Sequence, residues 1–154
     1  MKKTFLLTLF LCSFLKANYE IIENENLFLV KTENKSFQEN LLNLKDEINF
    51  QGFTIVYELN LAKTTNELAT LLEKKGVFKE GINLGICKSS FTLQMVEENF
   101  NNINYCPLFI SIYGKDNENF ISHKFYKPFK KNDQIANKIN ETLRFYAESK
   151  YDYK

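Results

Sequence analysis

The sequence has little of several residue types, and each shortage excludes a class of protein. Its 154 residues include only three cysteines, which are too few for a disulfide-rich scaffold. The formal net charge is only +1, so no strong basic field is present to hold a nucleic acid. No run of about 18 apolar residues follows the N-terminal segment, so we expect no transmembrane segment in the mature chain.

The remaining composition is that of one folded domain. Hydrophobic residues make up 44% of the chain and aromatic residues 15%, although tryptophan is absent and there are only five glycines and two prolines. This aromatic content excludes a disordered chain. The length supports one domain with a real core and is too short for two.

The first seventeen residues have the pattern of a cleavable signal peptide. Lys2 and Lys3 precede an apolar stretch over 4–15, and Ala17 is a small residue before the polar segment that follows. A lipoprotein cut before Cys12 fits less well because Leu11 is bulky, and the stretch is short for a retained anchor. We therefore expect residues 1–17 to be removed near Ala17, which places the mature protein in a periplasm.

Export changes the chemistry available to the chain. Loss of three lysines and no acid leaves 17 basic and 19 acidic residues, a formal charge of −2. Cys87 and Cys106 remain, and an oxidising compartment permits one disulfide between them. The abundance of Lys, Asn, Ile and Phe is typical of AT-rich coding, and together with the leader it indicates a Gram-negative bacterium. We expect one domain over 18–150 and a frayed tail over 151–154.

Apolar spacing predicts an α+β domain, with a mainly antiparallel sheet and helices packed on one of its faces. The expected order is β-α-β-α-β-α-β-β-α. The strands are expected at 27–30, 53–58, 82–87, 108–113 and 120–126. The helices are expected at 36–52, 64–74, 89–103 and 132–146, the last capped by Asn132.

Capping patterns place the helix starts. Ser36 with Glu39, and Thr64 with Glu67, each match a capping box, and Gly52 is a natural stop for the first helix. The third helix is expected to be capped by one of two serines and to have one apolar face. Those residues are Ser89 or Ser90 for the cap, and Leu93, Val96, Phe100 and Ile103 for the face.

The two cysteines bracket one strand–helix–strand unit. Cys87 ends a strand just before a helix, where free N–H groups and the helix dipole favour a thiolate. Cys106 precedes Pro107 at the start of the next strand, and Gly85 inside the earlier strand marks a close backbone approach or a bulge. The two thiols can meet only if the two strands are neighbours.

Three interpretations of this pair remain open at the level of sequence. A Cys87–Cys106 disulfide would close a loop of about 20 residues and add roughly 3 kcal/mol of stability. A reactive pair would take part in redox exchange or bind a soft metal or haem. Two unpaired cysteines would act as small buried hydrophobes.

His123 is the single histidine, on a strand face shared with Ile121 and Phe125. It is a candidate ligand or general base, and the alternative is a half-buried strand residue. No CxxC, CxxCH, HExxH or G-x-S-x-G motif is present. No motif therefore requires a cofactor, and the sequence does not identify a metal ion. It leaves open whether the protein is an enzyme, and the absence of a catalytic motif favours a non-enzyme.

Two segments resemble the bacterial domain-of-unknown-function family 302 (DUF302). The first runs from Gly85-Ile86-Cys87-Lys88-Ser89 through a helix to Asn104-Tyr105-Cys106-Pro107-Leu108 and the following strand. The second is the helix–strand unit of Phe37, Leu41, Ile48, Gly52, Phe53 and Ile55. Many members read Pro-Cys where this chain reads Cys106-Pro107. The resemblance covers most of 27–128 and implies a small α+β domain, often dimeric, without an established activity.

The leading functional hypothesis is an exported accessory or binding module. It would hold an unknown small ligand, a metal or a periplasmic protein partner near Cys87, Cys106, His123, Gly85 and Pro107. One alternative is a structural or interaction domain that forms a homodimer through the edge of the 108–126 hairpin. The other is an enzyme of thiol chemistry with Cys87 as its nucleophile.

Overall fold

A computed structural model describes residues 19–32, 36–115, 117–129, 131 and 134–148. The expected signal peptide, the Asn132 cap and the tail over 151–154 lie outside the described residues.

Six strands form one antiparallel sheet, in the spatial order β1-β2-β6-β5-β4-β3. The strands are β1 (Tyr19–Glu23), β2 (Leu27–Thr32), β3 (Thr54–Asn60), β4 (Glu80–Cys87), β5 (Leu108–Lys115) and β6 (Glu118–Lys124). The helices are α1 (Phe37–Phe50), α2 (Leu61–Leu71), α3 (Ser89–Glu98), the 3₁₀ helix η1 (Phe100–Tyr105) and α4 (Ile135–Glu148). This confirms the α+β class and the predicted order, to which the structure adds β1 as a further strand.

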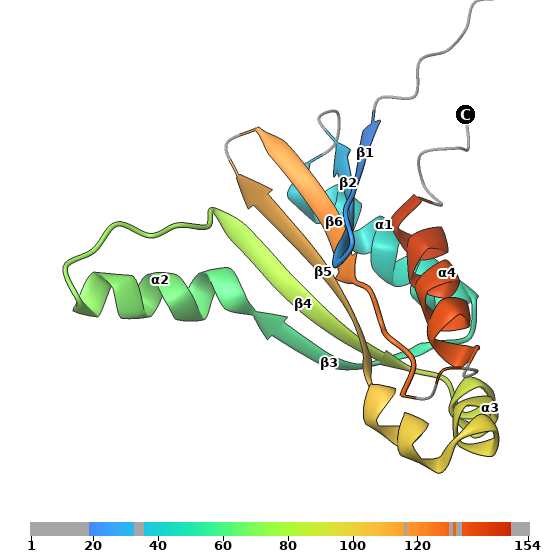
Figure 1. The fold of residues 1–154 in the computed structure, drawn as a ribbon. Coiled ribbons are helices and arrows are strands. Elements are labelled where there is room, and N and C mark those ends of the chain that lie inside the picture. The colour runs from blue at the N-terminus through green and yellow to red at the C-terminus, as the bar shows by residue number, and fades with distance from the viewer. Residues whose placement is uncertain (1–18, 33–35, 116, 130, 132–133, 149–154) are drawn as a thin grey trace, which may run out of the picture.

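The core lies between one face of the sheet and the helices α1 and α4, which pack side by side (Figure 1). Alternate residues of the central strands enter it, because successive side chains of a strand point to opposite faces. These fully or almost fully buried residues are Ile82, Leu84 and Ile86 of β4 and Leu108, Ile110 and Ile112 of β5. The helices contribute Leu41, Leu44 and Ile48 of α1 and Ile139 and Leu143 of α4.

The ends of α1 agree with the sequence, and the start of α2 does not. Ser36 Oγ accepts from the Glu39 N–H at 3.2 Å, and Gly52 takes φ +76° just past the helix. The predicted Thr64 cap is wrong because Asn60 Oδ1 accepts from the Lys63 N–H at 2.8 Å, which starts α2 at Leu61. Thr64 is therefore inside the helix, where its hydroxyl bonds back to backbone carbonyls.

The predicted cap and apolar face of α3 are also wrong. The N-cap is Lys88, which makes no side-chain capping bond, and the buried residues of α3 are Phe91 and Met95. Leu93 is 55% exposed because it lies on the side of α3 opposite Phe91 and Met95. Phe100 is 80% exposed because the helix ends at Glu98 and the chain turns into η1. Asn102 holds this turn by donating to the Met95 carbonyl at 3.1 Å.

The β5–β6 hairpin lies at the centre of the sheet and is not an edge. β5 pairs with β4 and β6 pairs with β2, so the proposed dimer contact through this hairpin is excluded by its position. The edges are β1 and β3. Figure 1 also shows α2 projecting from the body of the fold, and Ala62 is its one buried residue.

Candidate functional site

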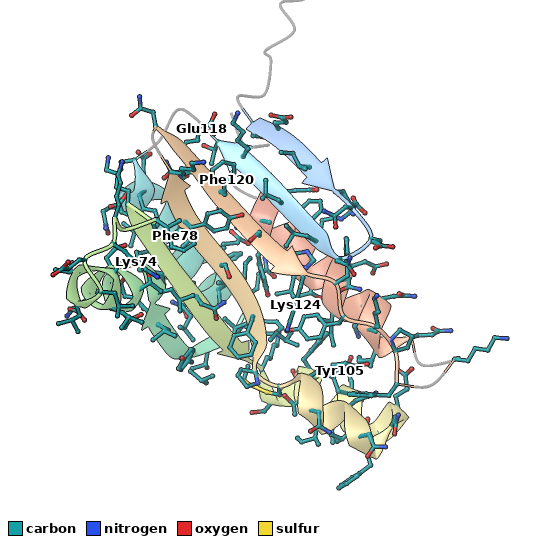
Figure 2. All side chains as sticks on the ribbon, turned by 60° about the vertical axis from the view of Figure 1, so that its left-hand side comes forward. Lys74, Phe78, Tyr105, Glu118, Phe120 and Lys124 are labelled. Carbon is teal, nitrogen blue, oxygen red and sulfur yellow. A yellow bond between two sulfur atoms is a disulfide. The ribbon has the colours of Figure 1, made fainter. Side chains whose placement is uncertain are left out.

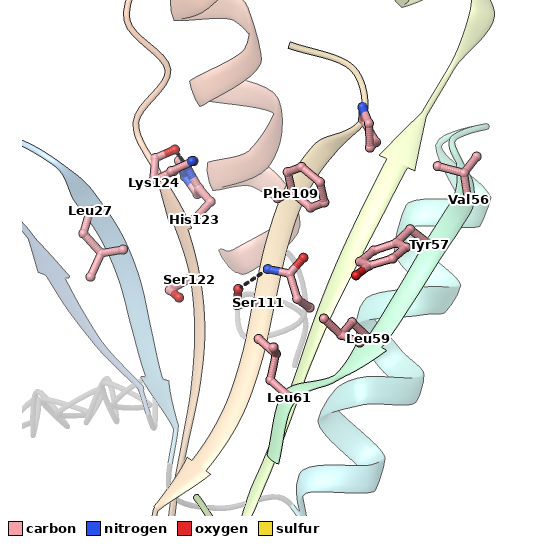
Figure 3. Close-up of a pocket in the computed structure, with 12 residues that line it drawn as sticks. Leu27, Val56, Tyr57, Leu59, Leu61, Phe109, Ser111, Ser122, His123 and Lys124 are labelled. Carbon is pink, nitrogen blue, oxygen red and sulfur yellow. Dashed lines mark hydrogen bonds between the residues drawn. The ribbon is translucent and has the colours of Figure 1, made fainter. Parts of the chain in front are cut away.

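A groove runs across the sheet face opposite α1 and α4, and we call it the open-face groove (Figure 3). Its volume is about 650 Å³, which is in the range of small-molecule pockets. Aromatic and aliphatic side chains predominate in its lining. The lining residues are Leu27, Val56, Tyr57, Leu59, Leu61, Asn83, Pro107, Phe109, Ser111, Ser122, His123 and Lys124.

Polar side chains form the floor of the groove. Ser111 of β5 and Ser122 of β6 are direct cross-strand partners. Asn83 Nδ2 donates to Ser111 Oγ at 2.8 Å across the β4–β5 pair. These residues alternate with the core residues of the same strands, so the face that lacks the helix layer presents hydroxyls and an amide.

The groove continues toward α2 as a second cavity of about 370 Å³. The two cavities share Leu61, Ser111 and Ser122, and the second adds Phe78 and Tyr113. The rings of Phe78 and Tyr113 meet edge to face with their centroids 6.4 Å apart. The base of α2 and the segment before β4 therefore form one wall of a continuous depression.

At the end of the groove away from α2, Tyr57 and Phe109 form an aromatic wall, and Gly85 lets these two side chains pack directly over β4. A Cβ at this position would stand 3.0 Å from the Tyr57 Cβ, 3.3 Å from Phe109 Cε1 and 3.3 Å from the Pro107 Cβ. Tyr57 and Phe109 meet edge to face above it, with centroids 6.3 Å apart. The predicted close approach is present, and the register shift lies on the opposing strand between Ile55 and Tyr57.

Cys87 and Cys106 are paired as a disulfide at this same end of the sheet, with their Cα atoms 6.4 Å apart (Figure 2). The condition set by the sequence is met because β4 and β5 are neighbours. The Thr92 hydroxyl of α3 lies 3.8 Å from the Cys106 sulfur. In this paired form neither sulfur is a thiolate, so nucleophilic or metal-binding chemistry at Cys87 requires prior reduction.

His123 is separated from the cysteine pair, because β5 lies between β6 and β4. It is 2% exposed, and its ring lies between those of Phe28 and Phe125 at centroid distances of 5.4 and 5.5 Å. Nδ1 lies 3.2 Å from the Lys124 carbonyl, and Nε2 has no partner among the described residues. Burial lowers the His123 pKa, which keeps the ring neutral.

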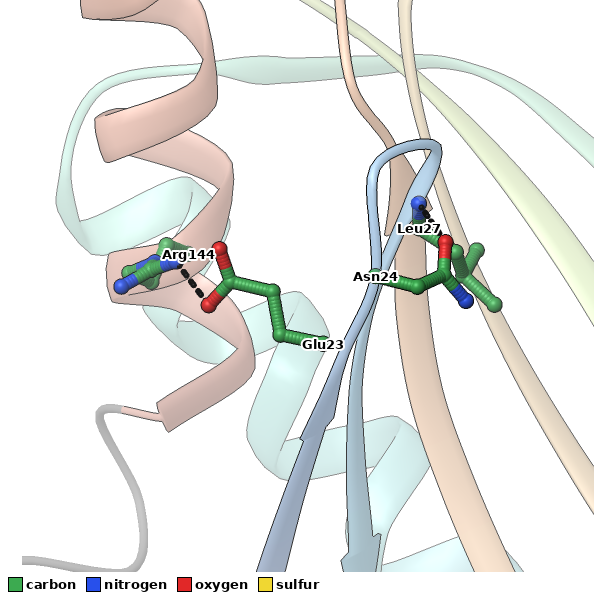
Figure 4. A network of polar contacts seen from close by, with 4 residues as sticks. All are labelled: Glu23, Asn24, Leu27 and Arg144. Atoms are coloured by element: carbon green, nitrogen blue, oxygen red, sulfur yellow. Dashed lines mark hydrogen bonds and ion pairs between the residues drawn. The ribbon is translucent and has the colours of Figure 1, made fainter.

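A polar cluster beside His123 joins the first hairpin to α4 (Figure 4). Glu23 at the end of β1 pairs with Arg144 of α4. The Arg144 guanidinium also lies 4.5 Å above the Phe28 ring. Asn24 Oδ1 accepts from the Leu27 N–H at 3.0 Å, which shapes the turn between β1 and β2. The charge of Arg144 lowers the His123 pKa in the same direction as burial, whereas the charge of Glu23 raises it.

The structure therefore brings together four of the five predicted site residues. Gly85, Cys87, Cys106 and Pro107 gather at one end of the groove. His123 lies on β6, two strands from β4, and its ring packs against the core residue Phe28 on the helix-covered side of the sheet. Within the described ranges there is no cluster of three His, Cys, Asp or Glu side chains suited to a metal ion. No helix in the same ranges is long and apolar enough to span a bilayer.

Sequence reasoning did not identify the residues that make the groove, above all Tyr57, Phe109, Ser111 and Ser122. A signal was present, because Asn83 and Ser111 interrupt strands that are otherwise apolar. Which face of those strands carries no helix layer depends on the packing of α1 and α4, and periodicity alone does not give it.

No protein-family model and no curated protein matches the chain. Among solved structures, the crystal structure of an uncharacterised conserved DUF302 protein from Bacillus stearothermophilus is similar, with a TM-score of 0.65. The match covers 79% of this chain and 95% of that chain at 14% sequence identity. This similarity concerns the fold, and it confirms that the fold is DUF302-like.

Proposed function

We propose that this protein is an exported accessory domain that binds a small, largely apolar ligand in the open-face groove. One observation carries the proposal: a depression of about 650 Å³ with an apolar lining and a few convergent polar groups lies on the exposed sheet face. The signal-peptide pattern of residues 1–17 supports a periplasmic location.

In this proposal the cysteine pair has a structural role. The disulfide ties the end of β4 to Cys106, whose neighbour Pro107 lines the groove together with Phe109. Fixing this end holds the aromatic wall in place before the ligand arrives, which reduces the entropy lost on binding.

Binding can be measured with N-phenyl-1-naphthylamine, a neutral apolar dye that fluoresces when it leaves water. We expect saturable binding to the wild-type protein and a large loss in Ser111→Tyr, which fills the floor of the groove. Thr54→Tyr, on the exposed start of β3, is the matched control and should bind normally. Equal binding by all three proteins would contradict the proposal.

Export and thiol state can be tested on protein isolated from the periplasm. Intact mass should correspond to a chain starting after Ala17, and alkylation should label Cys87 and Cys106 only after reduction. A full-length mass, or labelling before reduction, would contradict these two parts of the proposal.

A second candidate function is an interaction module, and the surface of α2 favours it. Leu71 is 81% exposed and Val77 is 78% exposed, with Leu68 and Leu72 also exposed beside them. A helix of 11 residues with one buried side chain gains little from tertiary packing, although packing is the usual source of helix stability. A partner on this surface would supply that packing.

Sedimentation velocity tests this second function. If α2 mediates a homodimer, the wild-type protein sediments as a dimer and Leu71→Glu as a monomer. Leu42→Glu is the control, because Leu42 is an equally apolar exposed residue on α1. A wild-type monomer at high concentration would exclude the homodimer.

A further inference from the structure

We propose that the ligand of the open-face groove is a single-chain anionic amphiphile such as a free fatty acid. Its carboxylate would lie at Lys124 and its tail would run toward α2. This inference rests on the proposed binding function and specifies the chemical class of the ligand.

The charge of the groove defines the head group. Lys124 is the one charged side chain among the described residues that line the two joined cavities. It is exposed and forms no ion pair with the described residues. No carboxylate lines either cavity, so an anionic head meets one cation and no repelling charge.

The hydroxyls beside Lys124 complete the head-group site. Ser122 lies two residues earlier on the same face of β6 and directly opposite Ser111. Ser111 Oγ already accepts the proton of the Asn83 amide, so its own hydroxyl proton is free to be donated. An ammonium and two hydroxyl donors match the acceptor oxygens of a carboxylate.

The shape of the groove defines the tail. Lys124 and Tyr113 lie on opposite sides of the Ser111–Ser122 pair, two residues from it in each case. Four steps along antiparallel strands span about 14 Å from Lys124 to Tyr113, and this is the length available to the head group and the acyl chain together. The walls along this path are apolar and come from Leu59, Leu61 and Phe78.

The discriminating experiment displaces N-phenyl-1-naphthylamine with three ligands that share one chain and differ in head group: laurate, dodecanol and dodecylammonium. We expect laurate to displace the dye at the lowest concentration. Because Lys124 is exposed, its ion pair is modest, and Lys124→Met should weaken laurate about threefold to fivefold without changing dodecanol. Lys124→Glu should make dodecylammonium the strongest competitor, and Lys115→Met, at the far end of β5, is the control.

Each other outcome overturns a distinct claim. If laurate and dodecanol displace the dye equally and Lys124→Met changes neither, the anionic head group is wrong while the groove still binds apolar molecules. If the protein binds no dye at all, the proposed function itself fails. Cosedimentation with phosphatidylglycerol vesicles without laurate binding would identify a membrane surface in place of a free acid. A dimer that excludes the dye would show that a second copy covers the groove.

Discussion

Asn140 of α4 bonds the backbone of Tyr126 in both directions. Its Nδ2 donates to the Tyr126 carbonyl at 3.0 Å, and its Oδ1 accepts from the Tyr126 N–H at 2.8 Å. The Tyr126 hydroxyl in turn accepts from the Phe109 N–H at 2.9 Å. One amide side chain therefore connects α4, through the segment after β6, to the strand that forms the wall of the groove.

Asn140→Ala should lower the free energy of unfolding by about 1–3 kcal/mol, because it leaves the Tyr126 backbone groups without their partner. Chemical denaturation with urea measures this loss. Asn137→Ala, an exposed position on the same helix, is the control and should change stability by less than about 0.5 kcal/mol. Equal losses in the two variants would show that the double hydrogen bond adds nothing.

Gly85→Ala should destabilise the fold by about 1–3 kcal/mol, since its Cβ meets the Tyr57 Cβ at 3.0 Å and two other side chains at 3.3 Å. Gly81→Ala is matched, because it lies on the same strand and face and meets its nearest atom at 3.6 Å, an ordinary contact. Alanine at position 81 should be neutral or should stabilise the fold by about 0.4–1 kcal/mol, because it lowers the conformational entropy of the unfolded chain. Thermal unfolding of both variants shows whether the loss in Gly85→Ala comes from the crowded side chains, because Gly81→Ala also removes a glycine but creates no crowding.

Reduction of the Cys87–Cys106 pair should cost roughly 3 kcal/mol, because the loop it closes spans a sequence separation of 19 residues. The melting temperature with and without dithiothreitol measures this cost. A Cys87→Ser/Cys106→Ser double variant should melt like the reduced wild-type protein and should not respond to dithiothreitol. A reductant effect of the same size in the double variant would assign the loss to another cause.

Stability should fall as the pH drops below the ordinary histidine pKa of 6.5 and toward the lowered pKa of His123 in the folded protein. Burial lowers the folded pKa first and the Arg144 charge lowers it further, while the Lys124 carbonyl and Glu23 act in the opposite direction. The unfolded chain therefore binds more protons in this window, and stability is fully present above it. His123→Phe, which never charges, should show a flatter dependence of unfolding free energy on pH below about 6.5. Parallel curves for the two proteins would contradict this assignment.

The predictable part of this fold is the part that periodicity encodes. Alternation in Phe53–Glu58 and Ile82–Cys87, and the capping box of Ser36, gave their elements directly. The start of α2 differs from the prediction because the Asn60 amide caps the helix in place of Thr64, and both residue types are suitable caps. The face of α3 was misplaced because the chain leaves the helix at Asn99, a break that the apolar spacing of Leu93, Val96 and Phe100 conceals.

The candidate site was predictable at one end and hidden at the other. Cys87 and Cys106 bracket neighbouring strands, so their meeting followed from topology once β4 and β5 were adjacent. Ser122 and Tyr57 carry no motif, and they share a site because the four adjacent strands β6, β5, β4 and β3 bring them onto one face of the sheet. The spacing of residues in the sequence does not predict this contact, because the contact depends on which strands are neighbours and on which face of the sheet the helices pack.

The hairpin of β1 and β2 covers the outer side of β6, so that β2 is an interior strand and β1 is the edge on that side of the sheet. The remaining strands would form a four-stranded meander, β3-β4-β5-β6, that ends on β6. Without β2, the backbone N–H and C=O groups of β6 would face solvent as a new edge, available to any other extended chain. The N-terminal hairpin thus moves this edge of the sheet from β6 to β1, a strand of only five residues that carries two glutamates. A proteolytic cut after Thr32 that released this hairpin would expose the seven residues of β6 as an edge that can recruit a replacement strand.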